Sequence, residues 1–202
     1  MIGKSFMAGV SLGVATCRKP TPPRALRQAG RLTARDSMQC LGSAKPGRVA
    51  MQRVLITGAA GDIGGRLRGT LKGVYPMLRL SDVRPLAAAG AGEEVDQTDL
   101  TDMVAVERMC EGVDGIVHLG GNSTEASWEV IRDANITGTY NLFEAARRQG
   151  VQRIVFATSN HAVGYYRRDQ VIDHQVVVRP DSRYGLSKAF GEALESDSKL
   201  YV

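Results

Sequence analysis

A glycine-rich turn between a short apolar run and a helical stretch constrains the fold of this 202-residue chain more than any other feature. Residues 53–57 predict a buried strand, and residues 61–72 predict a helix with apolar side chains at four-residue intervals. Because glycine has no Cβ, the turn between them can bring backbone amides close to a phosphate. The pattern therefore predicts the first strand–turn–helix unit of a nucleotide-binding domain.

The chain beyond this unit keeps alternating short apolar runs with helical stretches. Further strands are expected at residues 77–81, around Val95, at 114–119 and at 152–157. Further helices are expected after Asp102, at residues 128–149 and at 184–194. Strands that alternate with helices at this spacing predict an α/β fold, a Rossmann-like doubly wound parallel sheet.

Charge divides the chain into two parts. Residues 1–50 carry nine Lys or Arg and one acid, whereas residues 51–202 carry 17 basic and 20 acidic side chains. The first part lacks sustained apolar periodicity, so we predict a disordered basic extension at 1–50 and one NAD-binding Rossmann domain at 51–202. An Arg-rich, acid-poor leader is typical of an organellar transit peptide. Alternatively, the segment is an upstream extension and Met51 is the natural first residue.

Composition excludes several classes of function. The slightly acidic body gives no reason to expect nucleic-acid binding, and the absence of any run of 18 apolar residues argues against a membrane span. The three cysteines are scattered, which fits a reducing compartment and predicts a cytoplasmic protein. No His, Cys, Asp or Glu cluster has the spacing of metal ligands, so no metal is expected.

The ends of the predicted strands carry a candidate dinucleotide site. Asp82 ends the second strand, where a carboxylate accepts ribose hydroxyls and repels a 2′-phosphate. This favours NAD over NADP, although Arg84 nearby can accommodate such a phosphate. Asp99 and Leu100 follow the third strand, near the expected adenine. The remaining candidates form the first turn or follow the fourth strand, and are Gly58, Gly61, Asp62, Ile63, Gly64, Leu119, Gly120 and Gly121.

A tyrosine and a lysine four residues apart are the candidate reactive pair. Tyr184 and Lys188 would share one face of a helix, and a nearby ammonium lowers the pKa of a phenol. Lys188 would also bind the ribose of the cofactor. Ser159, at the end of the fifth strand, can hold a substrate oxygen while Tyr184 takes its proton, and Asn160 can add an amide contact. His161 is either a proton shuttle or a loop histidine with satisfied hydrogen bonds.

Several strings narrow the assignment. They are T-G-A-A-G-D-I-G, H-L-G-G, S-N-H-A-V-G-Y-Y and R-P-D-S-R-Y-G-L-S-K, together with Asp82 and the Ser159, Tyr184 and Lys188 triad. The chain resembles the extended short-chain dehydrogenase/reductase superfamily over about residues 51–195. Within it, the chain is similar to bacterial uronate dehydrogenases and their relatives in the NAD-dependent epimerase/dehydratase family.

This resemblance implies NAD-dependent oxidation of a hexuronic acid, such as galacturonate or glucuronate, at C1. The products are an aldarolactone and NADH. Tyr184 would be the base, Ser159 would orient the hydroxyl, and Ser123 and Asn160 match positions that line the sugar site. Asn135 matches the structural and proton-relay asparagine of the family. The resemblance also implies that the chain can form a homo-oligomer.

The chain departs from the resemblance after Lys188. Extended-type relatives continue further, with a small substrate-binding region, so we expect an incomplete C-terminal substrate region here. Two other functions therefore remain open. One is a nucleotide-sugar epimerase or dehydratase that uses the same triad with retained NAD, and the other is a truncated, non-catalytic dinucleotide-binding module.

Overall fold

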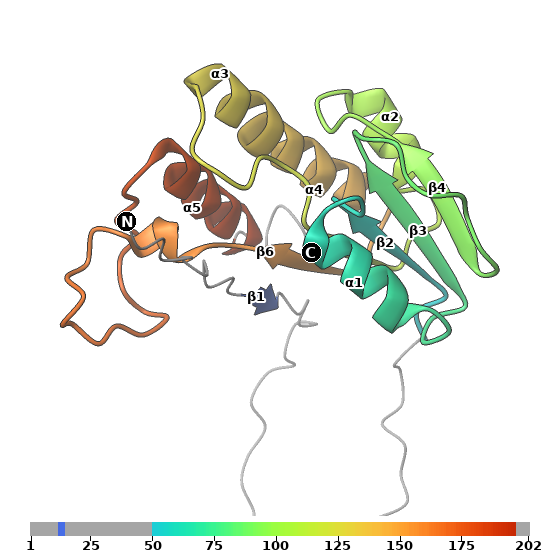
Figure 1. Ribbon diagram of the computed structural model, residues 1–202, viewed down its shortest axis with the longest axis horizontal. Coiled ribbons are helices and arrows are strands. Elements are labelled where there is room, and N and C mark those ends of the chain that lie inside the picture. Colours follow the sequence, from blue (N-terminus) through green and yellow to red (C-terminus); the bar gives the residue numbers. More distant parts are fainter. Residues whose placement is uncertain (1–11, 15–49, 197–202) are drawn as a thin grey trace, which may run out of the picture. The chain divides into compact units, whose positions relative to one another are not determined.

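The computed structural model describes residues 12–14 and 50–196 of the chain. Contacts divide the chain into two units, and of the unit at residues 18–50 only Ala50 is described. The other unit contains a six-stranded sheet with the strand order β1-β6-β5-β2-β3-β4 (Figure 1). Its last five strands are mutually parallel and confirm the predicted doubly wound sheet.

The parallel strands lie where the apolar runs predicted them, within one residue at each end. Only the third strand, expected around Val95, had no predicted bounds. The observed strands are β2 (Arg53–Thr57), β3 (Met77–Asp82), β4 (Glu93–Gln97), β5 (Gly115–His118) and β6 (Arg153–Ala157).

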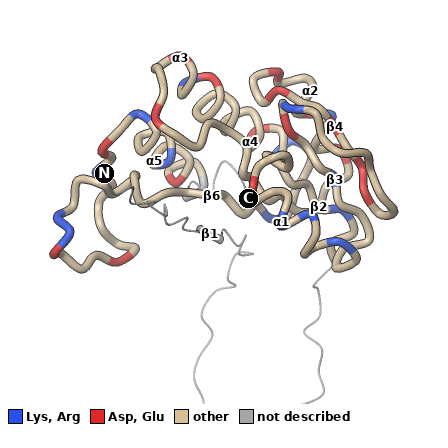
Figure 2. The backbone as a smooth tube through the Cα atoms, in the orientation of Figure 1, with Lys and Arg blue, Asp and Glu red and all other residues tan. Residues whose placement is uncertain are grey.

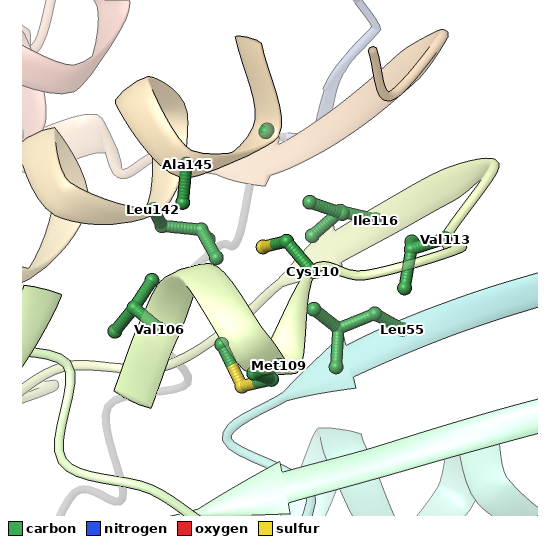
Figure 3. Close-up of a cluster of buried hydrophobic side chains, with 9 residues drawn as sticks. Leu55, Val106, Met109, Cys110, Val113, Ile116, Leu142 and Ala145 are labelled. Carbon is green, nitrogen blue, oxygen red and sulfur yellow. The ribbon is translucent and has the colours of Figure 1, made fainter. Parts of the chain in front are cut away.

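Helices cover both faces of the sheet, because alternate residues of a strand point to opposite sides. On one face, Leu55 of β2 packs with Met109 and Leu142 in the cluster of Figure 3, and Val54 and Ile56 join the core on the other face. The helical elements are α1 (Asp62–Leu71), α2 (Met103–Met109), α3 (Trp128–Ile131), η2 (Arg132–Thr137), α4 (Gly138–Arg148), η3 (Asn160–Val163) and α5 (Arg183–Ser196). None of the described helices is long and apolar enough to cross a membrane.

A short strand from the N-terminal segment occupies the outer edge of the sheet. β1 (Leu12–Val14) runs antiparallel to β6, with Gly13 opposite Phe156. For these three residues the structure differs from the expected disorder, because an edge strand offers backbone groups that a passing segment can pair. Most of the predicted extension, residues 1–11 and 15–49, lies outside the described residues.

The long helix expected at residues 128–149 is interrupted near its start. The chain forms α3, then the π-helical turn η2, then α4, and the Gly138 amide donates to the carbonyl of Asp133 five residues earlier. π-Helical turns often occur at functional sites. Here the turn carries Asn135, which is almost completely buried.

The order of the strands creates a topological switch point between β2 and β5. The chain leaves β2 toward β3 on one side and returns to β5 on the other. Open α/β sheets bind ligands beyond the carboxyl ends of the strands at such a point. The residues after β2 and β5 are Gly58 and the Leu119–Gly121 run, which the sequence predicted to hold a dinucleotide.

A buried carboxylate connects α1 to the start of β4. Acidic and basic residues are interspersed along the backbone around β3 and β4 (Figure 2), and the side chain of Glu93 there is only 2% exposed. Its carboxylate accepts hydrogen bonds from Arg68 at 2.7 and 3.1 Å and from the Gly90 amide at 2.8 Å. The bonds from Arg68 are the main reason that the pKa of Glu93 falls to about 2.

We expect Glu93→Gln to lower the free energy of unfolding by about 1–3 kcal/mol at pH 7, because it removes the charge that Arg68 neutralises. The folded-state pKa of Glu93 lies below its ordinary value, so its stabilisation is present above about pH 4.5 and is lost as the pH falls toward 2. The difference in the free energy of unfolding between the wild-type protein and Glu93→Gln should therefore become smaller as the pH falls. Urea unfolding of both proteins between pH 7 and pH 3 measures this difference. Glu111→Gln, at an exposed position, is the matched control.

Candidate active site

The turn after β2 is tight because its glycines let backbone segments touch. Gly58 has a φ of +70°, and a Cβ there would lie 2.7 Å from the carbonyl carbon of Leu119. A Cβ on Gly64 would collide with the carbonyl oxygen of Gly58, so α1 begins directly against the turn. The turn therefore lies at the N-terminus of a ten-residue helix, where amides and the helix dipole favour an anion.

Asp82 lies beside this turn at the end of β3. Its carboxylate accepts a hydrogen bond from the Ala60 amide at 3.0 Å and bonds from the Arg84 amide and Nε at 3.0 and 3.2 Å. Burial acts to raise the pKa of Asp82, but the bonds from Arg84 and Ala60 outweigh it and the pKa is lowered. The carboxylate is thus held ionised beside the turn, and the exposed Arg84 side chain lies next to it.

One cavity of about 830 Å³ at the switch point is lined by all the predicted cofactor residues except Lys188. This volume falls in the range of about 300–1,000 Å³ that is common for small-molecule sites. Ser123, predicted for the sugar site, also lines the cavity. The predicted cofactor residues along the cavity wall are Gly58, Gly61, Asp62, Ile63, Gly64, Asp82, Asp99, Leu100, Leu119, Gly120 and Gly121.

The cavity is also lined by residues that the sequence analysis did not predict. Ser81 and Thr98 stand at strand ends, where their position alone could have suggested them. Val130, Asp133 and Ala134 come from α3 and η2, and nothing in the sequence distinguishes them from other helical residues. Their place in the wall depends on how the interrupted helix packs against the sheet.

The structure also brings Ser159, Tyr184 and Lys188 together, but outside the lining of that cavity. Ser159 follows β6, and Tyr184 and Lys188 lie one turn apart at the start of α5. The Lys188 Nζ donates to the carbonyl of Ala157 at 2.9 Å and lies 5.6 Å from the centre of the Tyr184 ring. A hydrogen bond with Ser159 acts on the Tyr184 phenol.

The electrostatics of this triad differ from the expectation that Lys188 lowers the pKa of Tyr184. Burial raises the pKa of Tyr184, and only the bond with Ser159 opposes that rise. The Nζ lies over the ring and is directed at Ala157. Burial also lowers the pKa of Lys188 to about 8. Lys188 therefore remains mostly protonated at pH 7, at a cost in desolvation.

Asn160 lies at the surface beside Ser159, the predicted catalytic serine. The Ser159 hydroxyl donates to Asn160 Oδ1 at 3.3 Å and accepts a bond from the His161 amide at 3.2 Å. Asn160 is exposed, whereas Ser159 is buried. The predicted substrate contacts Ser159, Asn160 and Tyr184 thus share one end of the sheet, and Ser123 lies in the neighbouring cavity.

Asn135 connects the cavity to the helix that carries Tyr184. Its Oδ1 accepts from the Asn122 amide at 2.6 Å, and its Nδ2 donates to the Asn122 carbonyl at 2.9 Å and to the Ser187 hydroxyl at 3.0 Å. Ser187 in turn donates to the Tyr184 carbonyl at 2.7 Å. These bonds occupy the side chain that the resemblance assigned to proton relay, so its visible role is to join two segments. No sequence pattern pointed to a role for Asn122 or Ser187.

His118 is a buried, neutral member of the region. Its Nδ1 lies 2.7 Å from the hydroxyl of Thr57, which accepts a hydrogen bond from the Gly120 amide. Burial, with the charge of Lys188, lowers the pKa of His118 to about 3. Within the described residues, no three His, Cys, Asp or Glu side chains are arranged to hold a metal ion.

Residues 54–198 match the model of the NAD dependent epimerase/dehydratase family. The chain belongs to this family. Uronate dehydrogenases from Pseudomonas putida and Agrobacterium fabrum are 54% and 52% identical to it, each over 71% of this chain. The aligned part is 54% of each relative, so the chain spans about half the length of the curated relatives it matches.

Solved structures agree with this assignment. A mutant uronate dehydrogenase from Agrobacterium tumefaciens, complexed with NAD, has a TM-score of 0.70 and 52% identity over 72% of this chain and 55% of its own. A UDP-galactose 4-epimerase has a TM-score of 0.62 and 27% identity over 70% of this chain and 50% of its own. The family predicted from the motifs is therefore confirmed, and uronate dehydrogenases are among the family members that are similar to this chain.

We expect Lys188→Met to abolish turnover but to raise the free energy of unfolding by about 1–2 kcal/mol at pH 7, because it removes a buried charge. The folded-state pKa of Lys188, about 8, lies below its ordinary value of 10.5, so the destabilisation is greatest below pH 8. In urea unfolding from pH 7 to pH 10, the free energy of unfolding of Lys188→Met should exceed that of the wild-type protein by less and less as the pH rises. Arg66→Met, which removes an exposed cation on α1, is the control.

Proposed function

We propose that the chain is the NAD-binding, catalytic part of a dehydrogenase that oxidises a hexuronic acid at C1. Uronate dehydrogenases at 48–54% identity support this substrate, and a similar structure is complexed with NAD. One observation carries the proposal. The loop that lines the cofactor cavity is hydrogen-bonded, through Asn135 and Ser187, to the turn that carries Tyr184.

The residues around the cavity fit a dinucleotide. The amides at the start of α1 would bind the pyrophosphate, and the Asp82 carboxylate would accept hydrogen bonds from the adenosine ribose hydroxyls. Leu100, close to Gly120 and Gly138, offers an apolar wall for a base. Lys188 would bind the second ribose once its Nζ turns from the Ala157 carbonyl.

The triad then carries out the proton transfer. Ser159 would hold the C1 hydroxyl. Tyr184 would take its proton once the Lys188 ammonium, turned from the Ala157 carbonyl, favours ionisation of the phenol. When bound, NAD⁺ accepts the hydride from C1. The O–H and C–H bonds of C1 are both broken, and a C1=O bond forms. Because C1 is also bonded to the ring oxygen, the product is a lactone of the aldaric acid.

The proposed protein is cytoplasmic and forms a homo-oligomer. A cytoplasmic location is consistent with the scattered cysteines of the sequence. A homo-oligomer is expected from the resemblance. Gel filtration with light scattering would measure the assembly state.

We expect the purified chain to reduce NAD in the presence of galacturonate or glucuronate, measured as NADH absorbance. Tyr184→Phe should lower kcat at least about 100-fold, because it removes the general base, while the Kd for NAD stays within about twofold. Tyr140→Phe, at an exposed site on α4, is the matched control.

The outcomes separate the three functions. NADH formation that is lost in Tyr184→Phe and kept in Tyr140→Phe would support the dehydrogenase. Conversion of a nucleotide sugar without net NADH would indicate the epimerase or dehydratase. NAD binding by a folded protein with no turnover of either substrate would indicate the dinucleotide-binding module. Retained turnover in Tyr184→Phe would show that another group is the base.

We expect Asp82→Asn to raise the Kd for NAD about 10-fold and to lower the Kd for NADP, because a neutral amide no longer repels a 2′-phosphate near Arg84. Fluorescence titration with each cofactor measures both constants. Asp96→Asn, on the neighbouring strand β4, should change neither. Unchanged preference in Asp82→Asn would mean that other residues select the cofactor.

A further inference from the structure

A histidine–aspartate pair lies against the Tyr184 ring. The His161 Nδ1 lies 2.8 and 3.0 Å from the two carboxylate oxygens of Asp181. The ring centres of His161 and Tyr184 are 5.8 Å apart and the rings meet at 70°, edge to face. This pair takes no part in the proton and hydride transfers described above.

The fold leaves room for the pair at two glycines. A Cβ on Gly164 would collide with the Asp181 carboxylate, and a Cβ on Gly185 would collide with the carbonyl oxygen of His161. Gly185 is the residue after Tyr184, so the start of α5 packs directly on η3. The Asp181 amide also donates to the His161 carbonyl at 3.3 Å. Backbone contacts and side-chain bonds therefore join the same two segments.

Asp181 is itself held in place and charged. Ser182 Oγ donates to its Oδ1 at 2.9 Å and accepts from the Gly185 amide at 3.0 Å at the start of α5. Burial acts to raise the pKa of Asp181, but the bonds from His161 and Ser182 outweigh it and lower the pKa. An ionised carboxylate only accepts hydrogen bonds, so His161 must carry a proton on Nδ1.

His161 also contacts the second member of the triad, since its backbone amide donates to the Ser159 hydroxyl at 3.2 Å. One residue thus borders both Ser159 and Tyr184. We propose that Asp181 is a positioning residue which, through His161, holds the Tyr184 phenol and the Ser159 hydroxyl in register for the reaction. This inference rests on the proposed dehydrogenase function.

The first test uses kinetics in a double-mutant cycle. Asp181→Ala should lower kcat about 10-fold with the Kd for NAD within about twofold, and His161→Phe should lower it to a similar extent. The double variant should be no slower than His161→Phe alone. Asp181→Asn, which keeps a hydrogen-bond acceptor, should recover most of the rate. Asp169→Ala, at an exposed loop aspartate, is the matched control.

The second test needs no turnover and therefore separates this inference from the dehydrogenase function. In protein with ¹⁵N-labelled histidine, His161 should carry its proton on Nδ1, and the Nε2-protonated form should appear in Asp181→Ala. In protein with ¹³Cζ-labelled tyrosine, the Tyr184 signal, assigned with Tyr184→Phe, should move in Asp181→Ala. In the His161→Phe background, adding Asp181→Ala should move it no further. Asp181→Asn provides the same comparison if Asp181→Ala does not fold.

Two results would overturn the inference. One is a double variant whose losses multiply to about 100-fold, because Asp181 would then act independently of His161. The other is a Tyr184 signal that is unchanged in Asp181→Ala and Asp181→Asn, whether or not the wild-type protein oxidises uronates. If the wild-type protein oxidises no uronate but gives the expected spectra, the proposed substrate is wrong and the positioning role of Asp181 stands.

Discussion

The contact between the turn after β2 and the backbone after β5 is the constraint on which the site depends. Gly58 lies so close to Leu119 and Gly120 that a Cβ on it would clash with their backbone atoms. This approach fixes the distance between the two loops on either side of the switch point. The cavity lies beside this contact, and Asp82, bonded to the Ala60 amide of the same turn, lines the cavity.

A second set of hydrogen bonds connects the cavity to Tyr184. Asn135 joins the loop after β5 to Ser187, and Ser187 joins it to Tyr184. Buried polar groups of this kind are costly unless every partner is in place, so such a network favours one arrangement. The Asp181–His161 pair contacts the Tyr184 ring, whereas Ser187 bonds the Tyr184 backbone carbonyl, so two hydrogen-bonded connections end at this residue.

The same burial that orders the site shapes its electrostatics. It raises the pKa of Tyr184 and lowers the pKa values of Lys188 and His118. Lys188 is stabilised only partly by the Ala157 carbonyl and the face of Phe156. Active sites commonly retain such unfavourable charges because the reaction uses them.

The sequence by itself determined the alternating elements, the parallel sheet and the glycine turn, and it predicted the cofactor-binding and triad residues. These follow from local patterns: the periodicity of apolar side chains, glycines at a strand–helix junction, and a tyrosine and lysine one helical turn apart. Only the tertiary structure decided the π-helical turn at Asn135, the helix wall of the cavity, the strand β1 and the Asp181–His161 pair. Each of these depends on contacts between segments distant in the chain, whose energies no local pattern contains.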